Sequence, residues 1–125
     1  MGKFFVTKNS TWKYYFIFES DNGKKLLQSE YFNTKSEILK AINYLQNESN
    51  QSKNLKTYIE ANWYYFSITW DDGKVLANSF LYSWNRSEEY DDFNYIFKAM
   101  SKSEIVTVTQ EKLLNIQESK IRQNE

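Results

Sequence analysis

Two segments of the chain alternate between outward and inward positions with the period of two that is typical of half-buried β-strands. In residues 12–20 one face carries Tyr14, Phe16 and Phe18, and the other carries Lys13, Tyr15, Ile17 and Glu19. In residues 63–70 the matching faces are Tyr64, Phe66, Ile68 and Trp63, Tyr65, Ser67, Thr69. Because the first face is uniformly apolar, we expect helices to cover it and the mixed second face to stay open.

Each of these segments runs into an Asn-Gly or Asp-Gly pair and then into a second apolar run. This is the strongest short-range signal for a hairpin, and a type I′ turn requires positive φ at both central residues. The pattern therefore predicts strands over residues 12–20, 24–31, 63–70 and 74–81. It also predicts positive φ at Gly23 and Gly73.

A segment with helical spacing follows each hairpin. We expect one helix over residues 35–47, capped by Thr34 or Ser36, and another over residues 87–101, capped by Ser87. Short strands are expected at residues 3–7, 56–60 and 104–109, with a polar linker over residues 47–54. Residues 110–125 offer few apolar positions, so they predict a weakly helical tail.

The two halves of the chain resemble each other at an offset of 50 residues. Between Tyr14–Phe32 and Tyr64–Tyr82, eight of 19 aligned positions are identical, where chance gives about one. The identical pairs include Asp21/Asp71, Gly23/Gly73 and Ser29/Ser79. We interpret this as a tandem duplication.

The segment DNGKKLLQSEYFNTKSEILKAI, residues 21–42, resembles the YegP-like family. The second copy, DDGKVLANSFLY, departs from the pattern by lacking a Glu after Ser79. The resemblance implies an α+β fold in which two tandem β-β-β-α repeats form one antiparallel sheet with exchanged terminal strands and helices on one face. Residues 1–109 are then a single domain of two repeats (about 3–60 and 56–109), followed by the tail 110–125. The family has no established biochemical activity, so the resemblance addresses fold more than function.

Composition removes most enzyme classes. The chain has no Cys and no His, so it lacks thiolate catalysis, disulfides, and the commonest general base and metal ligand. We expect a protein without enzymatic activity, cofactor or bound metal.

Sixteen basic and sixteen acidic residues give zero net charge, which argues against tight binding of bare nucleic acid. With no signal-peptide core and no membrane-spanning stretch, we expect a cytoplasmic bacterial protein.

Acidic residues form two candidate sites. Glu88, Glu89, Asp91 and Asp92 lie at the predicted start of the second helix, where acids interact favourably with the helix dipole. The alternative is a patch that docks on a basic partner. Residues 1–60 carry +3 and residues 61–125 carry −3, which lends that alternative some weight. The carboxylates of Asp71-Asp72 could serve acid–base chemistry or bind a magnesium ion. Their position in a hairpin favours a role as turn residues instead.

The mixed sheet face suggests an aromatic strip of Tyr15, Trp63 and Tyr65. Such strips stack nucleic-acid bases or anchor protein partners. A dimer, the C-terminal tail or simple half-exposure explains them equally well, and both a monomer and a homodimer fit the pattern.

These features favour a non-enzymatic protein-binding module. Its partner would be a protein or ribonucleoprotein with a basic surface. One alternative is an inhibitor from a phage or mobile element that binds a host defence nuclease, as anti-CRISPR proteins do. Another is weak single-stranded nucleic-acid binding on the aromatic face.

Overall fold

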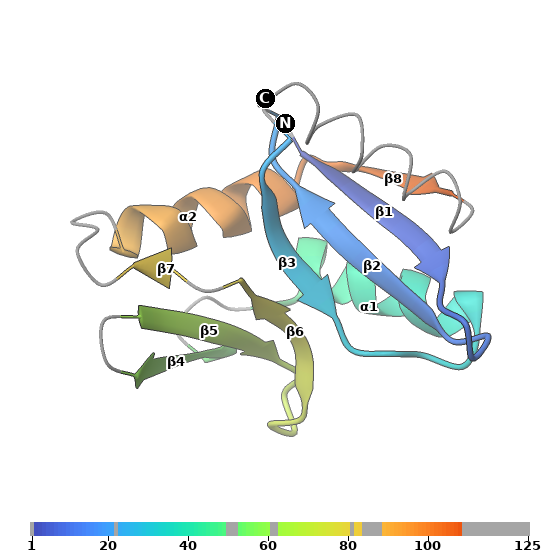
Figure 1. The fold of residues 1–125 in the computed structure, drawn as a ribbon, viewed down its shortest axis with the longest axis horizontal. Coiled ribbons are helices and arrows are strands. Elements are labelled where there is room, and N and C mark those ends of the chain that lie inside the picture. Colours follow the sequence, from blue (N-terminus) through green and yellow to red (C-terminus); the bar gives the residue numbers. More distant parts are fainter. Residues whose placement is uncertain are drawn as a thin grey trace.

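The computed structural model describes residues 2–21, 23–49, 53–60, 63–80, 82–83 and 89–108. Its elements, in chain order, confirm the predicted α+β class (Figure 1): β1 (Lys3–Lys8), β2 (Tyr14–Glu19), β3 (Lys25–Ser29), α1 (Lys35–Asn47), β4 (Leu55–Glu60), β5 (Trp63–Thr69), β6 (Val75–Ser79), β7 (Tyr82–Ser83), α2 (Glu89–Met100) and β8 (Glu104–Thr107). Across the described ranges no helix is both long and apolar enough to span a membrane. The predicted tail, 110–125, and the predicted cap Ser87 lie outside the described residues.

All the strands belong to one sheet, in the order β4-β5-β6-β3-β2-β1-β8, with β7 pairing beside β5. The expectation of a purely antiparallel sheet is wrong, because β8 runs parallel to β1 with Glu104 opposite Lys3. The connection between these parallel neighbours is the whole chain from β2 to α2, and α2 is the last element before β8. The last strand of the described chain therefore lies beside the first.

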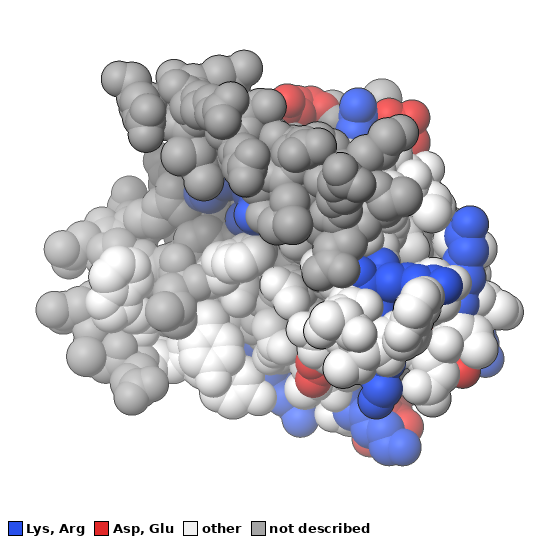
Figure 2. Space-filling view, turned by 45° about the vertical axis from the view of Figure 1, so that its right-hand side comes forward, with Lys and Arg blue, Asp and Glu red and all other residues white. Residues whose placement is uncertain are grey.

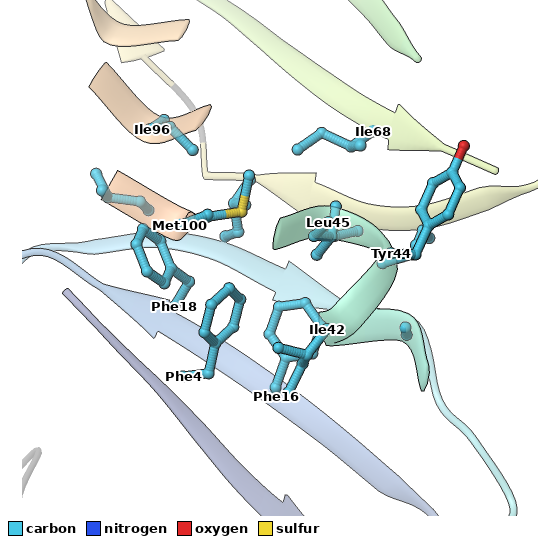
Figure 3. Close-up of a cluster of buried hydrophobic side chains, with 14 of the residues drawn as sticks. Phe4, Phe16, Phe18, Ile42, Tyr44, Leu45, Ile68, Ile96 and Met100 are labelled. Carbon is cyan, nitrogen blue, oxygen red and sulfur yellow. The ribbon is translucent and has the colours of Figure 1, made fainter. Parts of the chain in front are cut away.

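The core fills the space between the sheet and the helices. The side chains of Phe4, Phe16, Phe18, Phe66 and Ile68 from the strands form one buried cluster with Ile38, Ile42, Leu45, Ile96 and Met100 from the helices. Figure 3 shows the three N-terminal phenylalanines pointing towards Ile42 and Met100. Both helices thus cover the uniformly apolar face, as the alternation of residues predicts.

The opposite face is only partly open, which corrects the expectation from sequence. Ile17 is 4% exposed and Phe5 is 9% exposed, so this face is buried around β1 and β2. The pairing registers align one row of residues across it, which runs from Lys56 through Ser67, Asn78, Gln28, Ile17 and Phe5 to Val106. The row is polar over β4, β5, β6 and β3 and apolar over β2, β1 and β8.

Both hairpin turns have the predicted glycine conformation, but the β5–β6 turn is not of the predicted type. Gly23 and Gly73 have φ of 81° and 88°, as expected. Among the described residues that are not glycine, only Trp12 has positive φ. Asp72 therefore lacks the positive φ that a type I′ turn requires at both central residues. Instead Gly73 N–H donates to Trp70 C=O at 3.0 Å, and Trp70 N–H donates to Lys74 C=O at 2.9 Å. These bonds define a three-residue loop in which a left-handed residue follows a type I turn.

Helix α1 begins where the sequence predicts. Thr34 has extended backbone angles, and its hydroxyl accepts a hydrogen bond from Glu37 N–H at 3.1 Å. This satisfies one of the free N–H groups of the first turn. The cap fixes the start of α1 beside the loop that joins β1 to β2 (Figure 1).

Candidate functional site

The predicted aromatic strip is divided between two parts of the sheet. Tyr15 lies on β2, whereas Trp63 and Tyr65 lie on β5, and both β3 and β6 run between them. Three strand spacings separate β2 from β5 by about 14 Å. Tyr15 instead meets Tyr31 in an edge-on contact, with ring centroids 5.5 Å apart. The structure therefore brings Trp63 and Tyr65 onto one strand but leaves Tyr15 apart from them.

A different tyrosine completes the group on β5. Tyr58 of β4 lies opposite Tyr65, and the two rings stack at 4.8 Å with an angle of 16° between their planes. Trp63, two residues before Tyr65, points to the same side of the strand and is 51% exposed. We call Tyr58, Trp63 and Tyr65 the aromatic cluster.

Sequence reasoning missed Tyr58 because it depends on strand register. The segment 56–60 is predicted as a strand, but alternation alone does not show which residue of another strand lies opposite each position. The register Tyr58↔Tyr65 supplies that information.

The predicted acidic patch, Glu88, Glu89, Asp91 and Asp92, is described only in part. Glu88 lies outside the described residues. Glu89 begins α2 and Asp91 and Asp92 follow within its first turns, but the structure describes only their backbone. The two interpretations of these acids, helix-dipole stabilisation and docking on a basic partner, both stay predictions.

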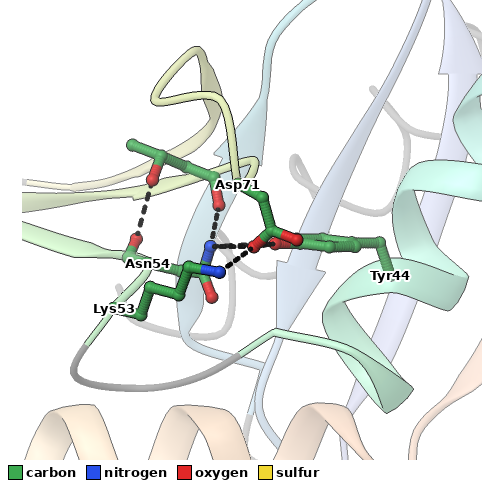
Figure 4. Close-up of polar contacts among 5 residues, drawn as sticks. Tyr44, Lys53, Asn54 and Asp71 are labelled. Atoms are coloured by element: carbon green, nitrogen blue, oxygen red, sulfur yellow. Dashed lines mark hydrogen bonds and ion pairs between the residues drawn. The ribbon is translucent and has the colours of Figure 1, made fainter.

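Asp71 is the centre of a polar network rather than an isolated turn residue (Figure 4). Its Oδ1 accepts a hydrogen bond from the hydroxyl of Tyr44 on α1 at 2.7 Å and pairs with Lys53 Nζ at 3.3 Å. The amide of Asn54, 1% exposed, donates to the Tyr44 hydroxyl and to Thr69 C=O, each at 2.8 Å. The network ties the β5–β6 turn to α1 and to the segment before β4.

The contacts of this network favour an ionised Asp71 and a neutral Tyr44. Hydrogen bonds from Tyr44, and then from Lys53 and Asn54, lower the pKa of Asp71, so its carboxylate stays ionised. Burial, followed by the hydrogen bond to Asp71, raises the pKa of Tyr44, so its hydroxyl stays neutral. A neutral phenol held as a donor to a carboxylate does not act as a base. We interpret the network as structural.

Asn54 shows why the network escapes detection in the sequence. It lies at the end of the polar run of residues 47–54, which is typical of an exposed linker. Its burial depends on Thr69 and Tyr44, which are 15 and 10 residues away. Within the described ranges, no three Asp, Glu, His or Cys side chains gather as metal ligands would.

The sequence matches no protein-family profile and no curated protein sequence. Its fold is similar to two solved structures. One is YegP of E. coli, a protein of unknown function, with 19% identity and a TM-score of 0.76 over 87% of this chain and 94% of that one. The other is a UPF0339 protein from Shewanella oneidensis, with 21% identity and a TM-score of 0.77 over 88% of this chain and 93% of that one. Together with the sheet order and the two helices on one face, these similarities show that the chain has the YegP-like fold.

Proposed function

We propose that this protein is a non-enzymatic protein-binding module that contacts its partner through the aromatic cluster. The observation that carries the proposal is the exposure of Trp63 beside the stacked pair Tyr58–Tyr65. Large aromatic side chains supply most of the binding energy at protein interfaces when a partner buries them. The buried core cluster includes none of these three residues, so the described core does not require aromatic side chains at these positions.

The position of the aromatic cluster at the end of the sheet supports the same proposal. β4 is the first strand in the sheet order, and its outer edge has no strand neighbour among the described residues. Ile59 on this strand is 60% exposed. An open edge next to exposed aromatic side chains suits a partner that adds a strand and buries the rings.

The charge distribution suggests a basic partner. The C-terminal half of the sequence carries the negative excess, including Glu88, Glu89, Asp91 and Asp92. Acids at the rim of an interface mainly steer the encounter, while aromatic anchors slow dissociation. We therefore propose a basic protein or ribonucleoprotein as the partner, held by the aromatic cluster.

Site-specific photo-crosslinking tests this proposal in the native host. A photoreactive phenylalanine analogue replaces Trp63 in one variant and Lys40 in the control, because Lys40 is exposed on α1. We expect one discrete protein crosslinked from Trp63 and none from Lys40, and the same protein should bind the parent chain after both are purified. Crosslinks of equal yield and identity from both positions, or no binding between the purified proteins, would contradict the proposal.

A further inference from the structure

Three hairpin loops of this fold share one set of backbone hydrogen bonds. In the loop of residues 70–74, the first N–H donates to the fifth C=O, and the fourth N–H donates to the first C=O. The loop of residues 20–24 repeats both bonds at 2.9 Å, and the β1–β2 loop of residues 9–13 repeats them at 2.8 and 3.2 Å. The fourth residue has positive φ in all three, but it is glycine in two and Trp12 in the third, with φ of 66°.

Tryptophan is an unfavourable residue at this position. A residue with a Cβ pays about 1–2 kcal/mol for a left-handed conformation, which glycine avoids. Burial does not compensate, since Trp12 is 76% exposed. Asn9 holds the loop instead, because its Oδ1 accepts hydrogen bonds from Thr11 N–H and Lys13 N–H at 3.0 Å each. A strained and exposed aromatic residue points to a role outside the fold itself.

Trp12 borders a groove of about 490 Å³ between the β1–β2 loop, the end of β8 and the first residue of α1. Lys8 and Lys35 line it, and its described lining contains no Asp or Glu. The structure gives neither lysine an ion-pair partner among the residues it describes. Figure 2, which turns this side of the molecule forward, shows Lys and Arg side chains there together with some Asp and Glu. The groove is therefore positively charged in a protein of zero net charge.

The ammonium group of Lys8 contacts two aromatic rings of the groove. Lys8 Nζ lies 5.3 Å from the ring centroid of Trp12 and 5.0 Å from that of Tyr14, which holds the ammonium group between two rings. The groove thus combines an exposed indole with two lysines that have no ion-pair partner among the described residues.

We propose that this groove binds a small anion that carries a planar ring, of the nucleotide class. A phosphate group between Lys8 and Lys35 would gain charge-assisted hydrogen bonds. The planar base would stack on the exposed indole of Trp12, which the loop holds at the rim. The volume of the groove lies within the range of small-ligand sites. This site is separate from the aromatic cluster, so neither proposal depends on the other.

Titration of the full chain with adenosine 5′-monophosphate, followed by NMR, tests the proposal. We expect a saturable shift of the Trp12 indole N–H, and binding at least about tenfold tighter than that of adenosine or inorganic phosphate alone. Lys8→Gln and Lys35→Gln should each weaken binding by about tenfold. Lys40→Gln, which changes the charge of α1 outside the groove, should leave binding unchanged.

Trp12→Gly separates binding from folding. Because glycine fits the left-handed position, this variant should melt at the parent temperature or above it, yet lose binding by tenfold or more. Trp12→Phe retains a ring and should recover most of the affinity. Three outcomes would each overturn the proposal: no saturable shift at Trp12, phosphate alone binding as well as the nucleotide, or unchanged binding in Trp12→Gly.

Discussion

The hydroxyl of Ser29 accepts a hydrogen bond from the main-chain N–H of Phe16, on the neighbouring strand, at 2.8 Å. The same hydroxyl donates to Glu30 C=O at 2.8 Å, so a buried side chain replaces a rung of the β2–β3 ladder. Ser79 repeats the arrangement on β6, with Phe66 N–H at 2.9 Å and Phe80 C=O at 3.0 Å. This explains why serine occurs at both positions of the 50-residue offset.

Ser29→Ala should destabilise the fold by about 1–3 kcal/mol, because it leaves the buried N–H of Phe16 without an acceptor. Ser79→Ala should cost less, since Ser79 is only partly buried whereas Ser29 is 3% exposed. Urea denaturation of both variants measures the difference in unfolding free energy. Equal and negligible effects would show that these hydroxyls do not support the sheet.

Gly73→Val should destabilise the protein by about 1–2 kcal/mol through backbone conformation alone. A Cβ at Gly73 would meet no atom within 4 Å, so overlap at the Cβ does not contribute to the expected cost. Gly73→Asn is the matched control, because asparagine tolerates left-handed angles, and it should lose less stability. If both variants melted together with the parent, the left-handed conformation of this turn would be contradicted.

Tyr44→Phe should cost about 1–2 kcal/mol, because it removes the donor to Asp71 and leaves the buried amide of Asn54 with one partner fewer. It should also change the response to alkali. Since the folded state raises the pKa of Tyr44 above its ordinary value of 10.0, the parent loses stability as the pH rises beyond about 10. The variant should lack this contribution in denaturation measurements from pH 8 to 11.

Asp71→Asn tests the acid side of the same network. The folded state lowers the pKa of Asp71 below 3.8, so its carboxylate stabilises the fold above that pH, and the contribution disappears as the pH falls through the lowered pKa. The variant should show a smaller loss of stability between pH 5 and 2. Its alkaline response should also be weaker, because the Asp71 carboxylate helps to raise the pKa of Tyr44. If the variant lost as much stability as the parent between pH 5 and 2, the loss would come from other carboxylates.

The elements could be predicted because their signals are local. Alternation over residues 12–20 and 63–70, two Asx-Gly pairs and the Thr34 cap identify strands, turns and a helix without knowledge of distant contacts. The offset of 50 residues also agrees with the register of the central strands, where Gln28 lies opposite Asn78.

The features that were missed depend on contacts between distant parts of the chain. Strand order separates Tyr15 from Tyr65, and register alone brings Tyr58 against Tyr65. The parallel pairing of β8 depends on where α2 delivers the chain. The glycine-like position of Trp12 shows only in its φ angle, because its loop contains no glycine to indicate a turn.

The dissociation rate of the purified complex between this protein and its crosslinked partner tests the proposed function most directly. Trp63→Ala should weaken the complex by about 2 kcal/mol, or about 30-fold, mainly through faster dissociation. Tyr31→Ala is the control, because Tyr31 is also 51% exposed but lies outside the aromatic cluster, and it should dissociate at the parent rate. Equal dissociation rates for the parent and Trp63→Ala, with both proteins folded, would contradict binding through the aromatic cluster.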